Sequence, residues 1–294
     1  MRLTLTPDNP APDGAICLPV VTDDGQVLRG MVARTSKPVG TVVLLGGRAD
    51  YIERYFETSR ELLARRLCVA ALDFRGQGGS QRPSREPMRC HVRSFASFDE
   101  DLRSFMTQVV VPNLPPPYYL LAHSTGGNIA LRALLTQGWF SKAVLTAPLL
   151  DVHYRAWPLP VVQVLTWGAQ AAGLGRLYLP GIRRACAVLE QSPELGLGGP
   201  TYGWLRAALN SFAMFRRLRR GTALKCPTLA VLAGLDQVVD NQASRDLERG
   251  ITSFATVTIP ESRHEILNET DDIRAQFFAV FDSYIGLKSD IRRT

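Results

Sequence analysis

The chain alternates short, continuous hydrophobic runs with longer stretches in which apolar residues recur every three or four positions. The runs at 41–45, 67–72, 118–123, 143–146, 228–233 and 255–259 predict strands that are buried on both faces. The stretches at 52–63, 95–109, 128–137, 242–249 and 273–284 predict amphipathic helices. Regular alternation of such elements indicates an α/β fold, with a mostly parallel central sheet and helices on both faces.

Two further strands are predicted near the N-terminus. The apolar segments 16–21 and 26–34 flank Asp23-Asp24-Gly25, a sequence typical of a tight hairpin turn. Because the strands of a hairpin are antiparallel, we expect an antiparallel pair to open an otherwise parallel sheet.

The alternation stops in the middle of the chain. Between Pro148 and about Thr222 the sequence is rich in Pro, Gly, Trp and Leu and contains no clear buried strand. An insertion at this point lies above the strand ends, where α/β proteins bind ligands. We therefore expect residues 1–148 and 223–294 to form the core and residues 149–222 to form a helical cap, or lid. The aromatic side chains of this cap are candidates for substrate binding: Trp157, Trp167, Tyr202 and Trp204.

The sequence Ala122-His123-Ser124-Thr125-Gly126 joins a predicted strand directly to a predicted helix. A residue in such a sharp turn adopts a positive φ, and the residues two positions before and after it approach each other, so they must be small. Ala122 and Gly126 meet this requirement. The turn would raise the Ser124 hydroxyl above the sheet as a nucleophile, next to the first amides of the helix. The alternative is a buried turn of small residues without chemistry.

A nucleophilic serine needs an acid and a histidine base, which follow it in that order in such a site. His264 comes directly after the last predicted strand, where the base would lie, and a surface-loop histidine is the alternative. Asp236 follows the preceding strand and would orient the His264 ring. Asp240 is the rival acid, although its position favours a helix cap. His123 is expected to point to the face opposite Ser124.

Two backbone amides are predicted to bind the oxyanion that forms during ester cleavage. A Gly-Gly pair turns the chain tightly after the strand 41–45, which makes the Arg48 amide one donor. The Thr125 amide begins the helix after the serine and is the second donor. Asp50 and Arg54, four residues apart, are expected to pair and to fix this loop.

Composition narrows the range of functions. The 294 residues include 46% hydrophobic and 21% charged residues, as in ordinary globular proteins. The five cysteines are scattered and lack CxxC spacing, so neither a disulfide framework nor a zinc site is predicted, and a reducing cytoplasm is the expected location. The formal charge of +7 is compatible with peripheral contact with an anionic membrane surface, but no nucleic-acid motif accompanies it. No metal or organic cofactor is expected, and the sequence does not indicate an oligomeric state.

Several stretches together resemble one protein family. They are GGRADYIERYFE (46–57), LDFRGQGGS (72–80), LLAHSTGG (120–127), PELGLGGPTYGWL (193–205) and the segments around Asp236 and His264. In this order they are similar to the serine α/β-hydrolases of the lysophospholipase and monoacylglycerol lipase group, which includes lysophospholipase L2-like proteins with a serine aminopeptidase S33-type hydrolase domain. The resemblance implies the α/β-hydrolase fold and places the nucleophile, acid and base on Ser124, Asp236 and His264.

The chain departs from this group at three points. Many relatives have His-Gly in place of Gly46-Gly47 and Gly in place of Ala122, changes that the backbone should tolerate. The cap before Pro193 is expected to be shorter than in relatives, which leaves the size of the substrate open.

The expected function is the hydrolysis of carboxylic esters that carry a fatty acyl chain, of the lysophospholipid or monoacylglycerol type, through an acyl-enzyme on Ser124. Two alternatives stay open. An aminopeptidase of the proline-iminopeptidase type would need carboxylates in the cap, for which Glu190 and Glu194 are the candidates. A non-catalytic hydrolase fold that binds a small lipid or hormone-like ligand would not need the complete set of three catalytic residues.

Overall fold

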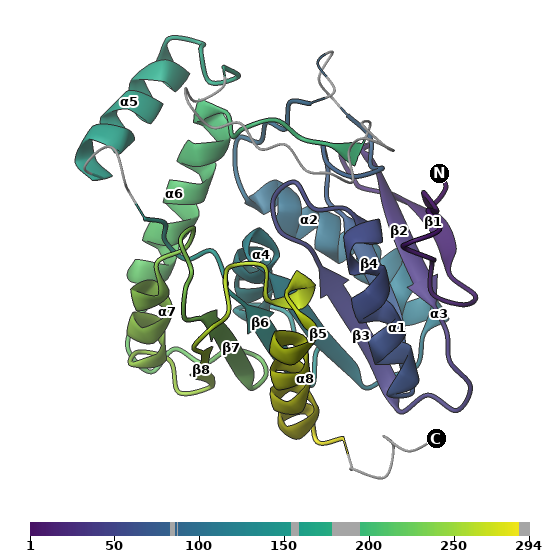
Figure 1. The fold of residues 1–294 in the computed structure, drawn as a ribbon. Coiled ribbons are helices and arrows are strands. Elements are labelled where there is room, and N and C mark those ends of the chain that lie inside the picture. The colour runs from purple at the N-terminus through teal and green to yellow at the C-terminus, as the bar shows by residue number, and fades with distance from the viewer. Residues whose placement is uncertain (83–85, 87, 154–158, 178–194, 288–294) are drawn as a thin grey trace.

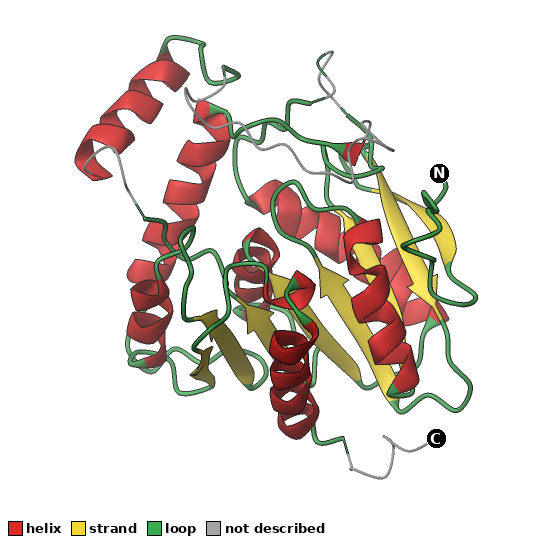
Figure 2. Cartoon of the chain, in the orientation of Figure 1, coloured by secondary structure: helices red, strands yellow, loops and turns green. Residues whose placement is uncertain are grey.

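A computed structural model describes residues 1–82, 86, 88–153, 159–177 and 195–287. In this part of the chain an eight-stranded sheet forms the centre of the molecule, in the order β1-β2-β4-β3-β5-β6-β7-β8. Helices cover both faces of the sheet (Figures 1 and 2). The α/β architecture expected from the sequence is confirmed.

The strand pairing explains where a site can form. The strands are β1 (Ile16–Val21), β2 (Val27–Ala33), β3 (Gly40–Leu45), β4 (Leu67–Asp73), β5 (Tyr118–His123), β6 (Lys142–Thr146), β7 (Thr228–Ala233) and β8 (Phe254–Ile259). β1 pairs with β2, and β2 with β4, in antiparallel fashion, as expected for the N-terminal hairpin. The pairs that join β3 to β8 are all parallel, so the carboxyl ends of these strands lie at one edge of the sheet.

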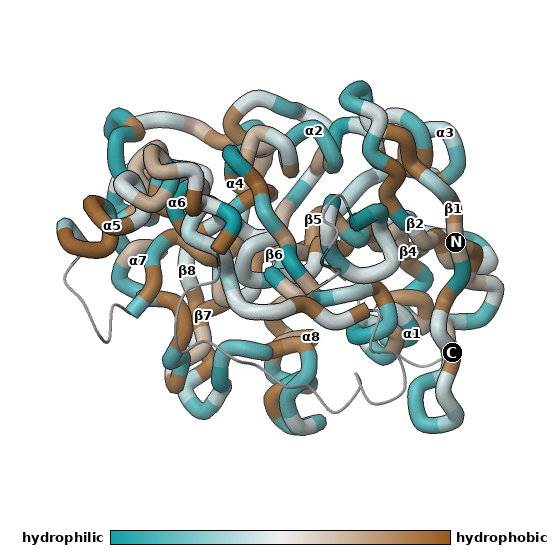
Figure 3. Tube along the Cα trace, turned by 90° about the horizontal axis from the view of Figure 1, so that it is seen from above, coloured by the Kyte–Doolittle hydropathy of each residue, from teal (hydrophilic) through white to brown (hydrophobic). Residues whose placement is uncertain are grey.

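The helices are distributed over the two faces. They are α1 (Phe56–Ala64), α2 (Ala96–Phe105), α3 (Val111–Asn113), α4 (Thr125–Leu134), α5 (Leu159–Ala171), α6 (Tyr202–Arg216), α7 (Asn241–Glu248) and α8 (Asp271–Ile285), with the 3-10 turns η1 (Ile52–Tyr55) and η5 (Ile266–Asn268). A π-helical turn, η2 (Met106–Val110), joins α2 to α3. In the view from above, α1 and α8 lie on one side of the sheet and α2 and α4 on the other (Figure 3).

Helix coverage on both faces explains why the central strands are hydrophobic at almost every position. All residues of β3, β4 and β7 are buried. α2 contributes Phe98 and Phe105 to the core, and the Phe98 ring lies edge-on to Phe74, with centroids 5.4 Å apart. Full burial of such a side chain stabilises the fold by about 1.5–3 kcal/mol. The core therefore holds the strand ends in fixed positions.

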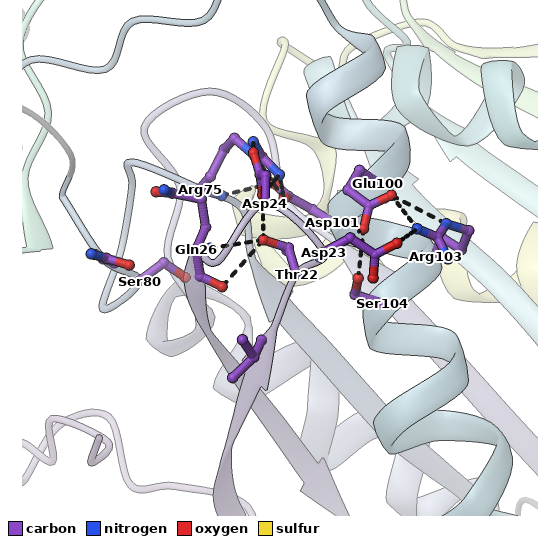
Figure 4. A network of polar contacts seen from close by, with 12 residues as sticks. Thr22, Asp23, Asp24, Gln26, Arg75, Ser80, Glu100, Asp101, Arg103 and Ser104 are labelled. Carbon is purple, nitrogen blue, oxygen red and sulfur yellow. Dashed lines mark hydrogen bonds and ion pairs between the residues drawn. The ribbon is translucent and has the colours of Figure 1, made fainter.

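The N-terminal hairpin is tied to the core through its acidic turn (Figure 4). Asp24 accepts a hydrogen bond from Arg75, which also donates to the buried Asp101 of α2 over 2.7 Å. Asp23 pairs with Arg103 on the same helix. The turn predicted from the sequence thus has charged partners both in α2 and in the loop that follows β4.

The insertion between β6 and β7 contains α5 and α6, and α6 packs onto the core. The Trp204 ring lies 5.6 Å from the Phe95 ring, between centroids. Ser211 donates to the side chain of Asn128 on α4 over 2.7 Å, and both residues are buried. Through these contacts α6 is anchored directly to the helix that follows Ser124.

α5 extends away from the sheet (Figure 1). Its Val164, Leu165 and Trp167 side chains are 67%, 51% and 60% exposed, so the helix presents an apolar surface. Within the described ranges, no helix combines the length and the apolar composition needed to cross a bilayer. Trp157, Glu190 and Glu194 lie outside the described residues.

Candidate active site

Ser124 sits in a strained turn between β5 and α4. Its φ of 50° and ψ of −115° lie outside the common regions for a residue with a side chain. The turn brings Gly126 against the end of β3, where a Cβ atom would lie 2.6 Å from the carbonyl oxygens of Leu45 and Gly46. Only glycine fits there without a backbone shift, which is the physical reason for the small residue in the motif.

The Ser124 hydroxyl lies beside a histidine that is held by an aspartate. His264 follows β8, and its Nε2 atom lies 3.0 Å from Ser124 Oγ. Its Nδ1 atom lies 2.8 Å from Asp236 Oδ2, in the loop after β7. With Nδ1–H donated to the carboxylate, the lone pair of Nε2 faces the serine hydroxyl, the tautomer needed in a general base.

Asp236 is fixed as an ionised acceptor. Its side chain is fully buried, and its Oδ1 accepts hydrogen bonds from the amides of Val238 (2.7 Å) and Val239 (3.0 Å). Burial would raise the pKa of Asp236, but the hydrogen bond to His264 and the two amides outweigh burial and lower that pKa below its ordinary value. Asp240 instead caps α7, where its side chain accepts from the Gln242 amide. The structure therefore places Asp236, and not Asp240, against the histidine.

The loop after β3 approaches Ser124 closely. A Cβ on Gly47 would lie 3.1 Å from Ser124 Cβ and 2.9 Å from Asp50 Oδ2. The Gly47 amide donates to Asp50 Oδ2 over 2.6 Å, so it is already used. The next amide in this loop, that of Arg48, is the candidate donor to a substrate, and the Thr125 amide starts α4, where no intrahelical acceptor is available to it.

The conformation of this loop is supported from two sides. Asp50 accepts from the Arg54 guanidinium (2.7 Å) and from the Tyr55 hydroxyl (2.6 Å), so the expected pair of Asp50 and Arg54 is present. From the loop after β4, the Gln77 side chain donates to the Gly47 carbonyl over 3.1 Å. Buried, mutually bonded polar groups of this kind limit the movement of the backbone that carries the Arg48 amide.

The Arg48 side chain points toward the inserted segment. Its guanidinium donates to the Gly198 carbonyl over 2.6 Å and lies 5.3 Å from the centre of the Trp204 ring. Trp204 is 6% exposed, whereas Tyr202 is partly buried at the start of α6 and Trp167 is exposed on α5. Of these aromatic residues, Trp204 is thus in contact with the loop that follows β3.

His123 lies beside His264, with 4.9 Å between the ring centroids. The expectation from the sequence that it points to the face opposite Ser124 is therefore wrong. Strand alternation does not continue through the positive φ of Ser124, so the last residue of β5 reaches the same site. Its Nε2 atom lies 3.4 Å from Glu265 Oε2, and Glu265 also accepts from Arg54. In the sequence, this contact is indicated by the position of Glu265 directly after His264.

One group of side chains in the described residues has the geometry to hold a metal ion. The ligand atoms of His123, His264 and Glu265 lie within 4.8 Å of one another. Each is engaged already: His123 with Thr146, His264 with Ser124 and Asp236, and Glu265 with Arg54. Their hydrogen bonds and charges are satisfied by these partners, so their close approach can be explained without a metal ion.

The fold and this geometry define an α/β-hydrolase with a serine, a histidine and an aspartate in contact at the carboxyl edge of the sheet. The structure is similar to that of a soluble variant of monoglyceride lipase from Saccharomyces cerevisiae, with a TM-score of 0.73 and 18% identity over 92% of this chain and 96% of that chain. The α/β-hydrolase fold implied by the sequence resemblance is confirmed.

Sequence comparison gives the family. Residues 36–271 match the model of the serine aminopeptidase S33 family (Hydrolase_4), and the chain belongs to this family. It is 30% identical to lysophospholipase L2 of Escherichia coli K12 over 80% of this chain and 76% of that protein. It is 28% identical to a monoacylglycerol lipase of Mycolicibacterium smegmatis over 80% of this chain and 84% of that protein.

Proposed function

We propose that this protein is a serine hydrolase that cleaves carboxylic esters carrying a fatty acyl chain, of the lysophospholipid or monoacylglycerol type. The observation that carries the proposal is the continuous set of contacts from Asp236 through His264 to Ser124, with distances of 2.8 Å and 3.0 Å. The names of the two curated relatives support a lipid ester as the substrate.

The proposed reaction uses these three residues in two steps. His264 takes the Ser124 proton as the serine oxygen attacks the ester carbonyl, and it then gives that proton to the departing alcohol. The acyl group remains on Ser124. His264 next takes a proton from water, which attacks the acyl-enzyme and releases the fatty acid. Asp236 stabilises the imidazolium form of His264 in both steps.

The oxyanion of each tetrahedral intermediate is proposed to bind the amides of Arg48 and Thr125. The first amide is presented by a loop fixed to Asp50, and the second by the N-terminus of α4, whose partial positive charge favours an anion. Such donors are effective because they are oriented before the charge develops.

We propose that residues 149–222 act as a cap over this site and that residues 1–148 and 223–294 form the catalytic core. The placement of α5 and α6 between β6 and β7 supports this division. The exposed apolar side chains of α5 suit an acyl chain, which supports Trp167 as an aromatic residue that contacts it. Trp157, Tyr202 and Trp204 are proposed as further contacts from the sequence alone.

Two alternatives are less well supported. An aminopeptidase needs an acidic group to bind the substrate amine, and its candidates, Glu190 and Glu194, lie outside the described residues. A non-catalytic binding protein has no need of a histidine within 3.0 Å of a serine in a strained turn.

We further propose a cytoplasmic location and peripheral contact with anionic membranes. The scattered cysteines suit a reducing compartment. The net charge of +7 and the apolar surface of α5 suit a membrane surface that supplies the substrate. Cell fractionation and co-sedimentation with vesicles, with and without phosphatidylserine, test these two points.

The central test is labelling with a fluorophosphonate probe followed by intact mass spectrometry. The wild-type protein should take up one probe, Ser124→Ala none, and Ser283→Ala, at an exposed serine of α8, one probe. Ester hydrolysis by Ser124→Ala should fall by about a million-fold, as expected for loss of a triad nucleophile. Full labelling of Ser124→Ala would contradict the proposal, as would prolyl amide substrates that react faster than every ester.

A further inference from the structure

His123 occupies an unusual position for a buried histidine. Its side chain is 3% exposed, and it lies at the end of β5 between Thr146 of β6 and Glu265 of the loop after β8. Neither the proposed reaction nor the oxyanion site uses it. A buried titratable group with two specific partners, so near the proposed base, needs a physical explanation.

The contacts of the ring determine its protons. Nδ1 lies 3.2 Å from the Thr146 carbonyl oxygen and 3.1 Å from the Thr146 hydroxyl, and Nε2 lies 3.4 Å from Glu265 Oε2. Carbonyl and carboxylate oxygens accept hydrogen bonds and donate none. An unprotonated Nδ1 would direct its lone pair at the carbonyl oxygen. The Thr146 hydroxyl can accept as well as donate, so a proton on each ring nitrogen suits all three oxygens, and the contacts favour an imidazolium cation.

The surrounding charges support this assignment. Glu265 faces His123 and Arg54, and Arg54 in turn bonds to Asp50, so a protonated His123 completes a row in which two cations alternate with two anions. Burial would lower the pKa of His123, but the charge and hydrogen bond of Glu265 and the charge of Asp50 outweigh burial and the opposing charge of Arg54, and raise it. The same cations hold the pKa of Glu265 well below its usual range.

This row of charges connects two loops of the proposed site. Asp50 holds the Gly47 amide in the loop that presents the Arg48 amide, and Glu265 directly follows His264 in the loop that carries the base. The groups that face His264 are then the Asp236 carboxylate at 2.8 Å, the His123 ring at 4.9 Å and the neighbouring Glu265.

We propose that His123 is a positioning residue that carries a positive charge, and that with Glu265 it fixes the loop of His264 and shapes the pH dependence of the reaction. The inference rests on the proposed function for its kinetic part only.

The first experiment measures how many protons the His123 ring carries and does not depend on catalytic activity. In full-length protein labelled with 15N-histidine, the resonances of His123 are assigned by their loss in His123→Gln. At about pH 8, well above the ordinary histidine pKa of about 6.5, both ring nitrogens of His123 should be protonated. In Glu265→Gln the same ring should lose one proton at lower pH than in the wild type. A neutral His123 ring in the wild type at this pH would overturn the inference and leave the proposed function untouched.

The second experiment measures kcat/KM for a neutral ester against pH. His123→Gln should move the acidic limb of the profile to higher pH by about one unit, the size expected for a charge at 4–6 Å. The double variant His123→Gln, Glu265→Gln removes one charge of each sign, so its limb should return toward that of the wild type. His153→Gln, at an exposed histidine, is the matched control and should leave the limb in place.

Failure of this inference can be distinguished from failure of the proposed function. An acidic limb that stays or moves down in His123→Gln overturns the inference, because a structural role alone would lower kcat without moving the limb. If His123→Gln does not fold, as judged by circular dichroism, the His123 resonances are assigned by elimination from His91→Gln, His153→Gln and His264→Gln, and the proton count of His123 in Glu265→Gln decides instead. Undiminished hydrolysis by Ser124→Ala would reject the proposed function, and the proton count would still test the charge of His123.

Discussion

Nδ1 of His264 donates to Asp236 over 2.8 Å, although the two residues lie in separate loops after adjacent parallel strands. Asp236→Asn keeps the size of the side chain, but the Asn amide can donate as well as accept a hydrogen bond. It therefore no longer holds His264 in the tautomer that carries its proton on Nδ1. We expect kcat to fall by about ten-thousand-fold, as for the same change in other triads. Steady-state kinetics with a p-nitrophenyl ester measures the loss.

The control for this prediction is four residues away. Asp240 caps α7, and Asn is an equally good cap, so Asp240→Asn should leave kcat and stability almost unchanged. Equal losses in the two variants would show that Asp236 has no special role in orienting His264.

Gly126→Ala is predicted to damage the turn that carries Ser124. The added Cβ would lie 2.6 Å from two backbone oxygens, which cannot move as a flexible side chain can. We expect unfolding free energy to fall by about 1–3 kcal/mol and kcat/KM to fall by about 100-fold, since a shift of the reacting group by 1 Å has that effect. Urea unfolding and ester kinetics measure both quantities.

Gly138→Ala is the matched control, because an added Cβ at that position meets nothing within 4 Å. It should unfold at the same urea concentration as the wild type and keep its activity. Wild-type kinetics in Gly126→Ala would mean that the turn can relax without moving Ser124.

Much of this architecture could be predicted from the sequence because the signals are local. Runs such as Thr228–Ala233 are apolar at nearly every position, and a strand buried between two helix layers requires that pattern. The order of Ser124, Asp236 and His264 after successive strands likewise follows from parallel topology, in which strand ends meet at one edge.

The features that could not be predicted depend on contacts between distant segments. The pairing of β2 with β4, and not with β3, is set by packing. The His123 ring reaches Glu265 only because the chain reverses at Ser124. Trp204 meets Arg48 because α6 packs on the core, a contact between residues that no short-range periodicity relates.

Arg48→Ala separates the role of the amide from that of the side chain. The guanidinium contacts Gly198 and Trp204, whereas the proposed oxyanion donor is the backbone amide, which the substitution retains. We expect kcat/KM for a small neutral ester to stay within about threefold of the wild type, while loss of an oxyanion donor costs about 100-fold or more. Parallel assays with a monoacylglycerol and a lysophosphatidylcholine complete the measurement.

The comparison variant is Arg245→Ala, at an exposed arginine of α7. A loss of about 100-fold with the small ester in Arg48→Ala alone would place the side chain in the catalytic site. A loss confined to lysophosphatidylcholine would show that the guanidinium binds the phosphate and would make lysophospholipid the preferred substrate.

The length of the acyl chain is the most direct test of the apolar surface on the inserted helices. Val164, Leu165 and Trp167 of α5 are exposed, and a cap that closed completely would keep every ester away from Ser124. Some of this surface should therefore line the path of the acyl chain. Each methylene buried there contributes about 0.8 kcal/mol, or about fourfold in binding, until the available surface is covered.

Measured below their aggregation limits, p-nitrophenyl esters should accordingly gain in kcat/KM from acetate to at least octanoate, and Trp167→Ala should flatten this gain without changing the value for acetate. Diacyl substrates should be poor, because the short cap expected from the sequence would offer room for one chain. Trp139→Ala, on the segment between α4 and β6, is the control for loss of an aromatic residue elsewhere and should keep the full slope. A profile that peaks at acetate would reject the fatty acyl assignment, since a bound chain that gains nothing from added methylenes is not in contact with an apolar surface.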